Sequence, residues 1–131
     1  MGKEPIIIAA SEPNSVFLEI FFKSLKTNTY KSPIIIFVSK KLLEKQMKML
    51  GFDFKINDIH KEFKDFSRLN NKKINLINVN YEFKKCFEII TSRSNKYIDA
   101  TFATALNFMK QNKLSKFING PVSKKSFLKG K

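Results

Sequence analysis

The sequence predicts an α/β protein, with three layers in which a mostly parallel sheet is covered by helices on both faces. Two observations carry this prediction. Short, continuous apolar runs recur along the 131 residues, and such runs are typical of strands buried on both faces, as in parallel sheets. Segments with apolar residues at helical spacing separate most of these runs, and this alternation favours parallel strands joined by helical crossovers.

Five short segments are predicted to be strands. The clearest are IIIAA and PIIIFV, which contain no charged residue. KINLINV has the same apolar character, and FINGP begins as a strand that Gly120 and Pro121 should end. The predicted strands are residues 6–10, 33–38, 52–56, 73–79 and 117–119.

The first two predicted helices follow the first two strands and carry recognisable ends. Asn14 or Ser15 can cap the first helix, which should end near residues 27–30. Ser39 is a plausible N-cap for the second helix, and Gly51 stands where a C′ glycine belongs. The apolar stripes at helical spacing are Leu18, Phe21, Phe22 and Leu25 in the first helix, and Leu43, Met47 and Leu50 in the second.

The second half of the sequence is less regular. Residues 57–72 are rich in charged and amide side chains, and we expect an exposed insertion with one or two helical turns. Residues 81–93 form a connector without a clear period. Ser94 should then cap the most strongly patterned helix, and Ser123 could open another. The inner stripe of the helix after Ser94 is predicted to be Ile98, Phe102, Ala105, Leu106 and Met109.

The composition excludes several classes of protein. One Cys allows no intramolecular disulfide, and with one His there is no complete set of zinc ligands of the usual kinds. The longest apolar runs are far too short to cross a bilayer, and the first residues lack the pattern of a signal peptide. We therefore expect a reducing, cytoplasmic location and no membrane partner.

The net charge of +14 would ordinarily suggest nucleic-acid binding. However, only Arg68 and Arg93 are arginines, and the lysines are dispersed along the chain. Arginine is the residue that reads guanine and grips phosphate with two parallel hydrogen bonds. A solvated, lysine-rich surface is therefore the favoured interpretation, and nucleic acid is not the expected partner.

Two loops at predicted strand ends carry candidate binding residues, since ligands in such sheets lie beyond the carboxyl ends of the strands. In SEPNS, Glu12 and Asn14 precede a helix, whose N-terminus favours a negative charge. In NGPVSK, Gly120 and Pro121 shape a turn and Lys124 adds a positive charge, a combination that suits a phosphate or carboxylate. A capping carboxylate and an ordinary strand-to-helix turn are the structural alternatives.

Other chemistry-bearing residues are interpreted as structural. His60 lies in the polar insertion and should be a surface histidine. Cys86 has no neighbouring His in the sequence and should be a small, partly buried apolar residue. Neither G-x-G-x-x-G nor G-x-x-x-x-G-K-[ST] occurs, so a Rossmann or P-loop nucleotide site is unsupported.

The same two loops resemble motifs of one enzyme family. FINGPVSKKSF resembles the (I/V)TGPV-x-K loop of 4-hydroxythreonine-4-phosphate dehydrogenase, and SNKYIDATFATALNFMKQNKLSKF is similar to the helix that leads into that loop. IIIAASEPNSVFLEI resembles the family's opening motif, with Glu12, Pro13 and Glu19 on matching positions. KKLLEKQMKMLGFDFKI fits its second helix and third strand, so the resemblance covers nearly the whole sequence.

Several positions depart from the family pattern. Ser11 replaces the first glycine of the opening motif, and Asn14, Ser15 and Phe17 replace a small residue and two further glycines. Each change adds a side chain where the backbone would approach a ligand. Ser123 stands where His is common. We therefore expect altered ligand contacts in the SEPNS loop.

The resemblance implies an incomplete three-layer fold like that of isocitrate and isopropylmalate dehydrogenases. Residues 1–131 would be the N-terminal part of the enzyme, with the second domain and the C-terminal half absent. The implied reaction is NAD(P)-dependent oxidation, with decarboxylation, of 4-phosphohydroxy-L-threonine in pyridoxal 5′-phosphate (vitamin B6) biosynthesis. The implied enzyme is a homodimer with a divalent metal, whose ligands would lie outside this chain.

No catalytic residue is identifiable in these 131 residues, and the chain alone is expected to be inactive. Two alternatives remain open. One is a phosphate- or acyl-handling enzyme of the same architecture, because one fold can serve many chemistries. The other is a non-catalytic, basic nucleic-acid-binding module, which would bind in a salt-dependent way.

Overall fold

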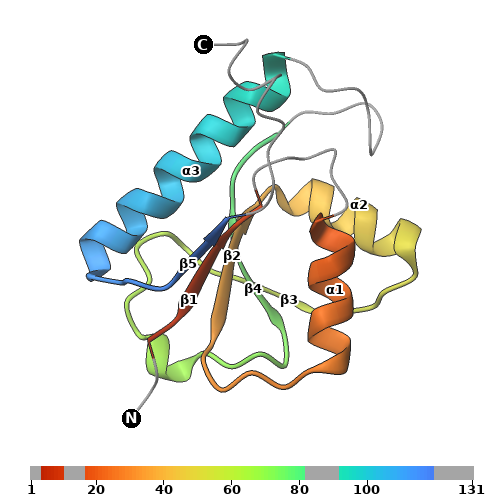
Figure 1. Ribbon diagram of the computed structural model, residues 1–131, viewed down its shortest axis with the longest axis horizontal. Helices are drawn as coiled ribbons and strands as arrows, with labels where there is room; N and C mark the ends of the chain where they lie inside the picture. The colour runs from red at the N-terminus through yellow and green to blue at the C-terminus, as the bar shows by residue number, and fades with distance from the viewer. Residues whose placement is uncertain (1–3, 11–16, 82–91, 120–131) are drawn as a thin grey trace.

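A five-stranded parallel sheet forms the middle layer of the computed structural model, which describes residues 4–10, 17–81 and 92–119 (Figure 1). The strand order is β3-β4-β2-β1-β5, and every described pair of neighbouring strands is parallel. The strands are β1 (Ile6–Ala9), β2 (Ile34–Val38), β3 (Ile56–Asp58), β4 (Ile74–Asn78) and β5 (Phe117–Asn119). The predicted parallel sheet is confirmed.

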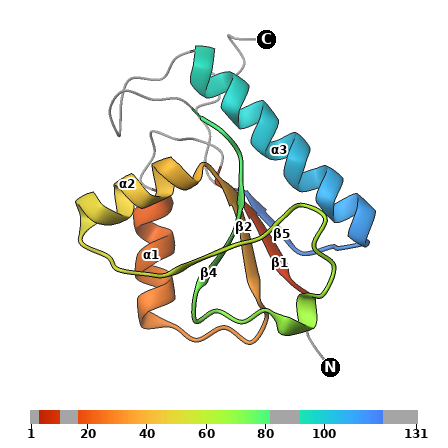
Figure 2. The same ribbon diagram turned by 180° about the vertical axis from the view of Figure 1, so that it is seen from behind.

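Helices cover both faces of this sheet, as the sequence predicts. Two of them lie together on one face, and the long third helix crosses the other face (Figures 1 and 2). The helices are α1 (Phe17–Thr27), α2 (Lys40–Leu50) and α3 (Ser92–Asn112), with a short 3-10 turn, η1 (Phe66–Arg68).

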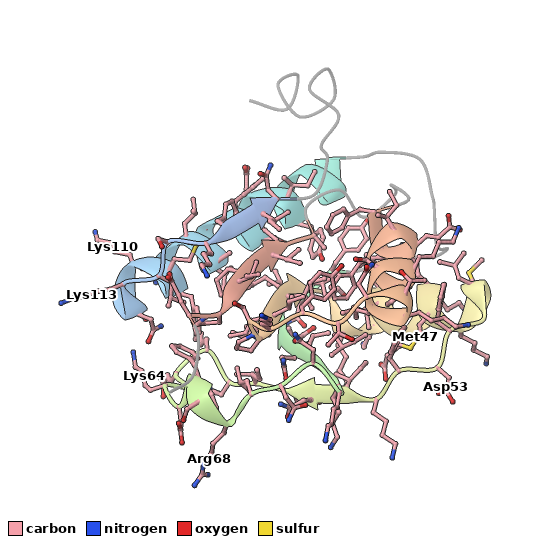
Figure 3. The ribbon with its side chains drawn as sticks, turned by 60° about the horizontal axis from the view of Figure 1, so that its bottom comes forward. Met47, Asp53, Lys64, Arg68, Lys110 and Lys113 are labelled. Carbon is pink, nitrogen blue, oxygen red and sulfur yellow. The ribbon has the colours of Figure 1, made fainter. Side chains whose placement is uncertain are left out.

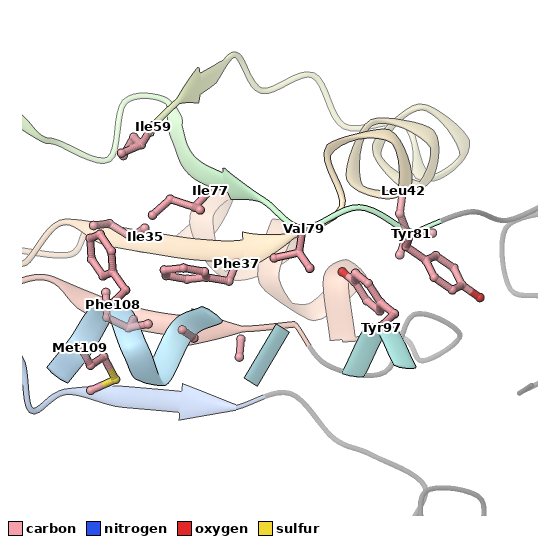
Figure 4. Packing of buried hydrophobic residues seen from close by; sticks show 13 residues of the cluster. Ile35, Phe37, Leu42, Ile59, Ile77, Val79, Tyr81, Tyr97, Phe108 and Met109 are labelled. Carbon is pink, nitrogen blue, oxygen red and sulfur yellow. The ribbon is translucent and has the colours of Figure 1, made fainter. Parts of the chain in front are cut away.

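Alternation along the strands divides the core into two halves. Ile35 and Phe37 face α3, whereas Ile34 and Ile36 face α1 and α2, because successive side chains of a strand point to opposite faces. All five residues of β2 are buried, which explains why its sequence is apolar without a break. Figure 4 shows the half of the core on the α3 side.

Helix α2 has the ends that the sequence predicts. The Ser39 hydroxyl accepts a hydrogen bond from the backbone N–H of Leu42 at 3.2 Å. Gly51 takes the left-handed conformation with φ 79°, which costs glycine little because it has no Cβ. These two residues therefore fix where α2 begins and ends.

The third strand lies later in the sequence than predicted. Residues 52–55 form no strand, and β3 begins at Ile56, opposite Ile74 of β4. The Phe52 and Phe54 rings instead pack near the Phe22 ring of α1, with centroids 5.3 and 6.1 Å away. Aromatic packing on the helical layer therefore takes precedence over strand pairing in this segment.

Two details of the α3 prediction are wrong. The helix begins at Ser92, so Ser94 lies inside it rather than capping it. Leu106, placed on the inner stripe, is 51% exposed, whereas Phe108 is 2% exposed and its ring lies 5.4 Å from that of Phe37. The inner stripe of α3 therefore excludes Leu106 and includes Phe108.

The polar insertion at residues 57–72 contains one 3-10 turn but is more buried than predicted. Ile59 is 7% exposed, and Phe63 and Phe66 pack against the α3 side of the core. The Lys64 ammonium donates to Asn112 Oδ1 at 3.1 Å, which joins this segment to the end of α3. Figure 3 shows Lys64 on the side of the molecule where Lys110 and Lys113 mark the end of this helix. The aromatic side chains of this segment thus cover the core, although most of its other residues are charged or polar.

Candidate functional site

The carboxyl ends of all five strands lie along the same edge of the sheet, because the strands are parallel. Strand β1 lies between β2 and β5. The chain first adds β2 on one side of β1, and only after β4 does it cross back to add β5 on the other side. This reversal makes the β1–β5 boundary a topological switch point. Ligands of open α/β sheets bind in the crevice outside the strand ends at such a point.

The predicted site residues belong to the two loops that leave this switch point. Ala9 and Asn119 are register partners at the ends of β1 and β5, so the SEPNS and NGPVSK segments depart from adjacent positions. The residues themselves lie outside the described part of the chain, and their proximity stays a prediction. They are Glu12, Asn14, Gly120, Pro121 and Lys124.

A polar pocket of about 360 Å³ lies along the same edge, at the ends of β2 and β4. None of the residues that line this β2–β4 pocket is among the site residues predicted from the sequence. The available signal was that these residues directly follow two buried strands. Its lining consists of Ser39, Lys40, Lys41, Asn78, Asn80 and Tyr81.

Lys40 connects three elements around this pocket. Its backbone N–H donates to Asn78 Oδ1 at 2.8 Å, and its ammonium lies 2.6 Å from Asp58 Oδ2. The hydrogen bond to Asp58 and the attraction of that carboxylate raise the pKa of the Lys40 ammonium. Lys40 therefore keeps its positive charge at the pocket, while Asp58 neutralises part of it.

Tyr97 holds α3 against the start of α2. Its hydroxyl accepts a hydrogen bond from the Ser39 N–H at 2.8 Å, and its ring lies 4.7 Å from that of Tyr81 (Figure 4). Tyr97 is 3% exposed, and burial raises the pKa of its phenol well above the usual value. The phenol is therefore neutral at physiological pH.

Three backbone N–H groups at the start of α2 already have hydrogen-bond partners within this protein. The N–H groups of Ser39, Lys40 and Leu42 donate to Tyr97, Asn78 and the Ser39 hydroxyl, respectively. The positive charge at the β2–β4 pocket comes from the side chains of Lys40 and Lys41. The Asn78 amide N–H donates to Asn80 Oδ1 at 3.0 Å, which orders the other wall.

His60 and Cys86 are the two remaining residues that the sequence analysis interpreted as structural. The His60 side chain is 73% exposed and lies beside Glu62, so the surface histidine is confirmed. Cys86 lies outside the described residues. Within residues 4–10, 17–81 and 92–119, no three His, Cys, Asp or Glu side chains gather as a metal site would require, and no helix is long and apolar enough to span a membrane.

Comparison with known proteins identifies the family of this chain. The model of the family "Pyridoxal phosphate biosynthetic protein PdxA" matches residues 29–131. No curated protein sequence matches this chain.

Solved structures show the same fold. A 4-hydroxythreonine-4-phosphate dehydrogenase from Burkholderia phymatum is 19% identical, with a TM-score of 0.80 over 97% of this chain and 38% of its own. The corresponding enzyme from Klebsiella pneumoniae is 13% identical, with a TM-score of 0.79 over 95% of this chain and 38% of its own. This chain therefore spans little more than a third of the length of these structures.

Proposed function

Because this chain belongs to the family of the pyridoxal phosphate biosynthetic protein PdxA, we propose that residues 1–131 are the N-terminal part of an NAD(P)-dependent dehydrogenase. The substrate proposed is 4-phosphohydroxy-L-threonine. The observation that carries this proposal is the family match across residues 29–131. As the family resemblance implies, we propose that the whole enzyme is a cytoplasmic homodimer with a second domain that completes the cleft.

The proposed reaction removes a hydride and a proton from the substrate's secondary alcohol. NAD(P)⁺, when bound, would supply the oxidant for this step, and the β-keto acid so formed would lose its carboxylate as carbon dioxide. The part proposed for this chain is to bind anionic groups at the β1–β5 edge. Lys124 is proposed to attract a phosphate or carboxylate there, with Gly120 and Pro121 shaping the turn and Glu12 and Asn14 on the facing loop.

The described residues also bear on the metal that the family resemblance implies. They contain no cluster of three potential metal-ligating side chains, so they do not fit a resident divalent cation. We therefore assign no metal-dependent step to them. Their proposed contribution is positive charge, from Lys40 and Lys41 of the β2–β4 pocket. This pocket lies at the same ends of the strands where we propose that the phosphate groups of the substrate and dinucleotide bind.

The purified 131-residue chain is expected to form no NADH or NADPH from 4-phosphohydroxy-L-threonine, because the chain has one histidine and that residue is on the surface. Absorbance at the wavelength of the reduced cofactor measures this, with a heat-killed sample as the control. Turnover above that control would show that this chain holds a complete site.

A longer protein tests the proposed function itself. It is made from the encoding DNA, with the reading frame continued beyond residue 131. This protein is expected to reduce NAD⁺ or NADP⁺ only when 4-phosphohydroxy-L-threonine is present. A longer protein that folds and binds the dinucleotide but leaves this substrate unchanged would contradict the proposed function.

A further inference from the structure

An apolar groove of about 190 Å³ lies between α1 and the face of the sheet formed by β1 and β5. None of its described lining residues is charged, and the two polar ones, Ser24 and Tyr30, hydrogen-bond to each other through their hydroxyls. The α1–β5 groove is lined by Ile6, Ile8, Phe17, Ile20, Phe21, Ser24, Leu25, Tyr30, Ile34 and Ile118. Its surface thus offers contacts to apolar side chains and almost nothing else.

Exposure across the groove changes abruptly between neighbouring strands. Ile8 of β1 and Ile118 of β5 are register partners on the same face of the sheet. Ile8 is 6% exposed, whereas Ile118 is 49% exposed. Ile20, on the flank of α1 that borders the groove, is 58% exposed. The cover that α1 provides therefore stops between β1 and β5.

The opposite face of β5 is covered. Phe117 packs against the α3 side of the core, and its ring lies 6.4 Å from that of Phe102. Parallel strands are normally buried on both faces. Within the described residues, α3 covers one face of β5. The other face, which borders the α1–β5 groove, has no such cover.

The segment placed to supply that cover is the one that follows β5 in the chain. A connection that leaves a parallel strand runs back along a face of the sheet, usually as a helix. Residues 120–131 follow Asn119 directly, and Ser123 is a residue that could open a helix there. This segment contains three large apolar residues among its lysines, namely Val122, Phe127 and Leu128.

The segment is long enough for this role. The four steps from Asn119 to Ser123 span at most about 14 Å, and a helix of the eight residues that follow Ser123 would be about 12 Å long. A tethered segment also competes with effective concentrations in the millimolar range, which favours it over a second copy of the chain at ordinary protein concentrations.

We propose that residues 123–131 dock in the α1–β5 groove and insert Phe127 and Leu128 against Ile20 and Ile118. The lysines of this segment then remain toward solvent, as the uncharged lining requires. Docking would also hold Lys124 near the carboxyl end of β5. This proposal concerns how the chain packs and does not depend on the reaction proposed above.

Disulfide trapping tests the docking in the 131-residue chain. In a Cys86→Ser background, Ile20→Cys is combined with Leu128→Cys. The matched control combines Leu106→Cys with Leu128→Cys, because Leu106 is similarly exposed, at 51%, but lies on the opposite helical layer. Under mild oxidation, the intramolecular disulfide with position 20 is expected to form at least about tenfold faster than that with position 106, because docking raises the local concentration.

Each other outcome overturns the proposal. Equal rates, or no intramolecular disulfide in either pair, would mean that the segment does not dock there. A mainly intermolecular product from the position 20 pair would assign the groove to a second copy. Should the cysteine variants fail to fold, hydrogen exchange of the unsubstituted chain decides, since docking should slow exchange at residues 127–131 at least about tenfold relative to an unstructured segment. Unprotected amides there would refute it.

Discussion

Replacing Phe37 by alanine is expected to lower the free energy of unfolding by about 3–5 kcal/mol. Phe37 is 0% exposed in the central strand β2, and its ring meets that of Phe108 at 5.4 Å with an interplanar angle of 66°. The substitution removes buried apolar atoms and leaves a cavity that the sheet cannot close. Since small domains are typically stable by about 5–15 kcal/mol, the loss would be a large part of the total.

Urea unfolding followed by circular dichroism measures this loss. The matched control is Met49→Ala, because Met49 lies in α2 and is 57% exposed. A surface change of this kind should alter stability by no more than about 0.5 kcal/mol. Equal losses from the two substitutions would mean that Phe37 is not in a packed core, and the two-sided sheet would be wrong.

The second large effect concerns binding. In a full-length homologue that carries the same GPVSK loop, Lys124→Ala is expected to weaken the binding of the substrate or cofactor about tenfold to a hundredfold, with little change in folding stability. The physical reason is the loss of one charge-assisted hydrogen bond, worth roughly 1.5–3 kcal/mol. Titration calorimetry with the phosphorylated substrate and with the dinucleotide measures the change.

Lys125→Ala is the control for this experiment. Adjacent residues of a helix do not share a face, so Lys125 should point elsewhere if Ser123 opens a helix. Equal weakening by both substitutions would mean that only general positive charge matters. Unchanged binding after Lys124→Ala would leave the loop as an ordinary strand-to-helix turn.

Much of the fold follows from local patterns in the sequence. Strands such as β2 are buried on both faces, so their apolar runs are uninterrupted and easily recognised. The ends of α2 are equally local, because Ser39 and Gly51 act on the helix that they flank. Where two local signals compete, the sequence misleads: in FDFKI the aromatic residues pack against Phe22, and strand pairing starts only at Ile56.

Contacts between distant residues could not be predicted in this way. Asn75 is 2% exposed in β4 because its amide donates to the Ile34 and Asn70 carbonyls, and the former partner is 41 residues away. The β2–β4 pocket was missed for the same reason, since Asn78 and Tyr97 reach the start of α2 from other elements. The position of β5 beside β1 likewise depends on long-range pairing.

The central claim is that the SEPNS and NGPVSK loops form one site at the β1–β5 switch point. The most direct test is the distance between the Cα atoms of Glu12 and Gly120 in a crystal structure of this chain. Since both loops leave adjacent parallel strands at the same edge, this distance is expected to be below roughly 20 Å, a large part of the diameter of a small domain. A greater separation would contradict a shared site.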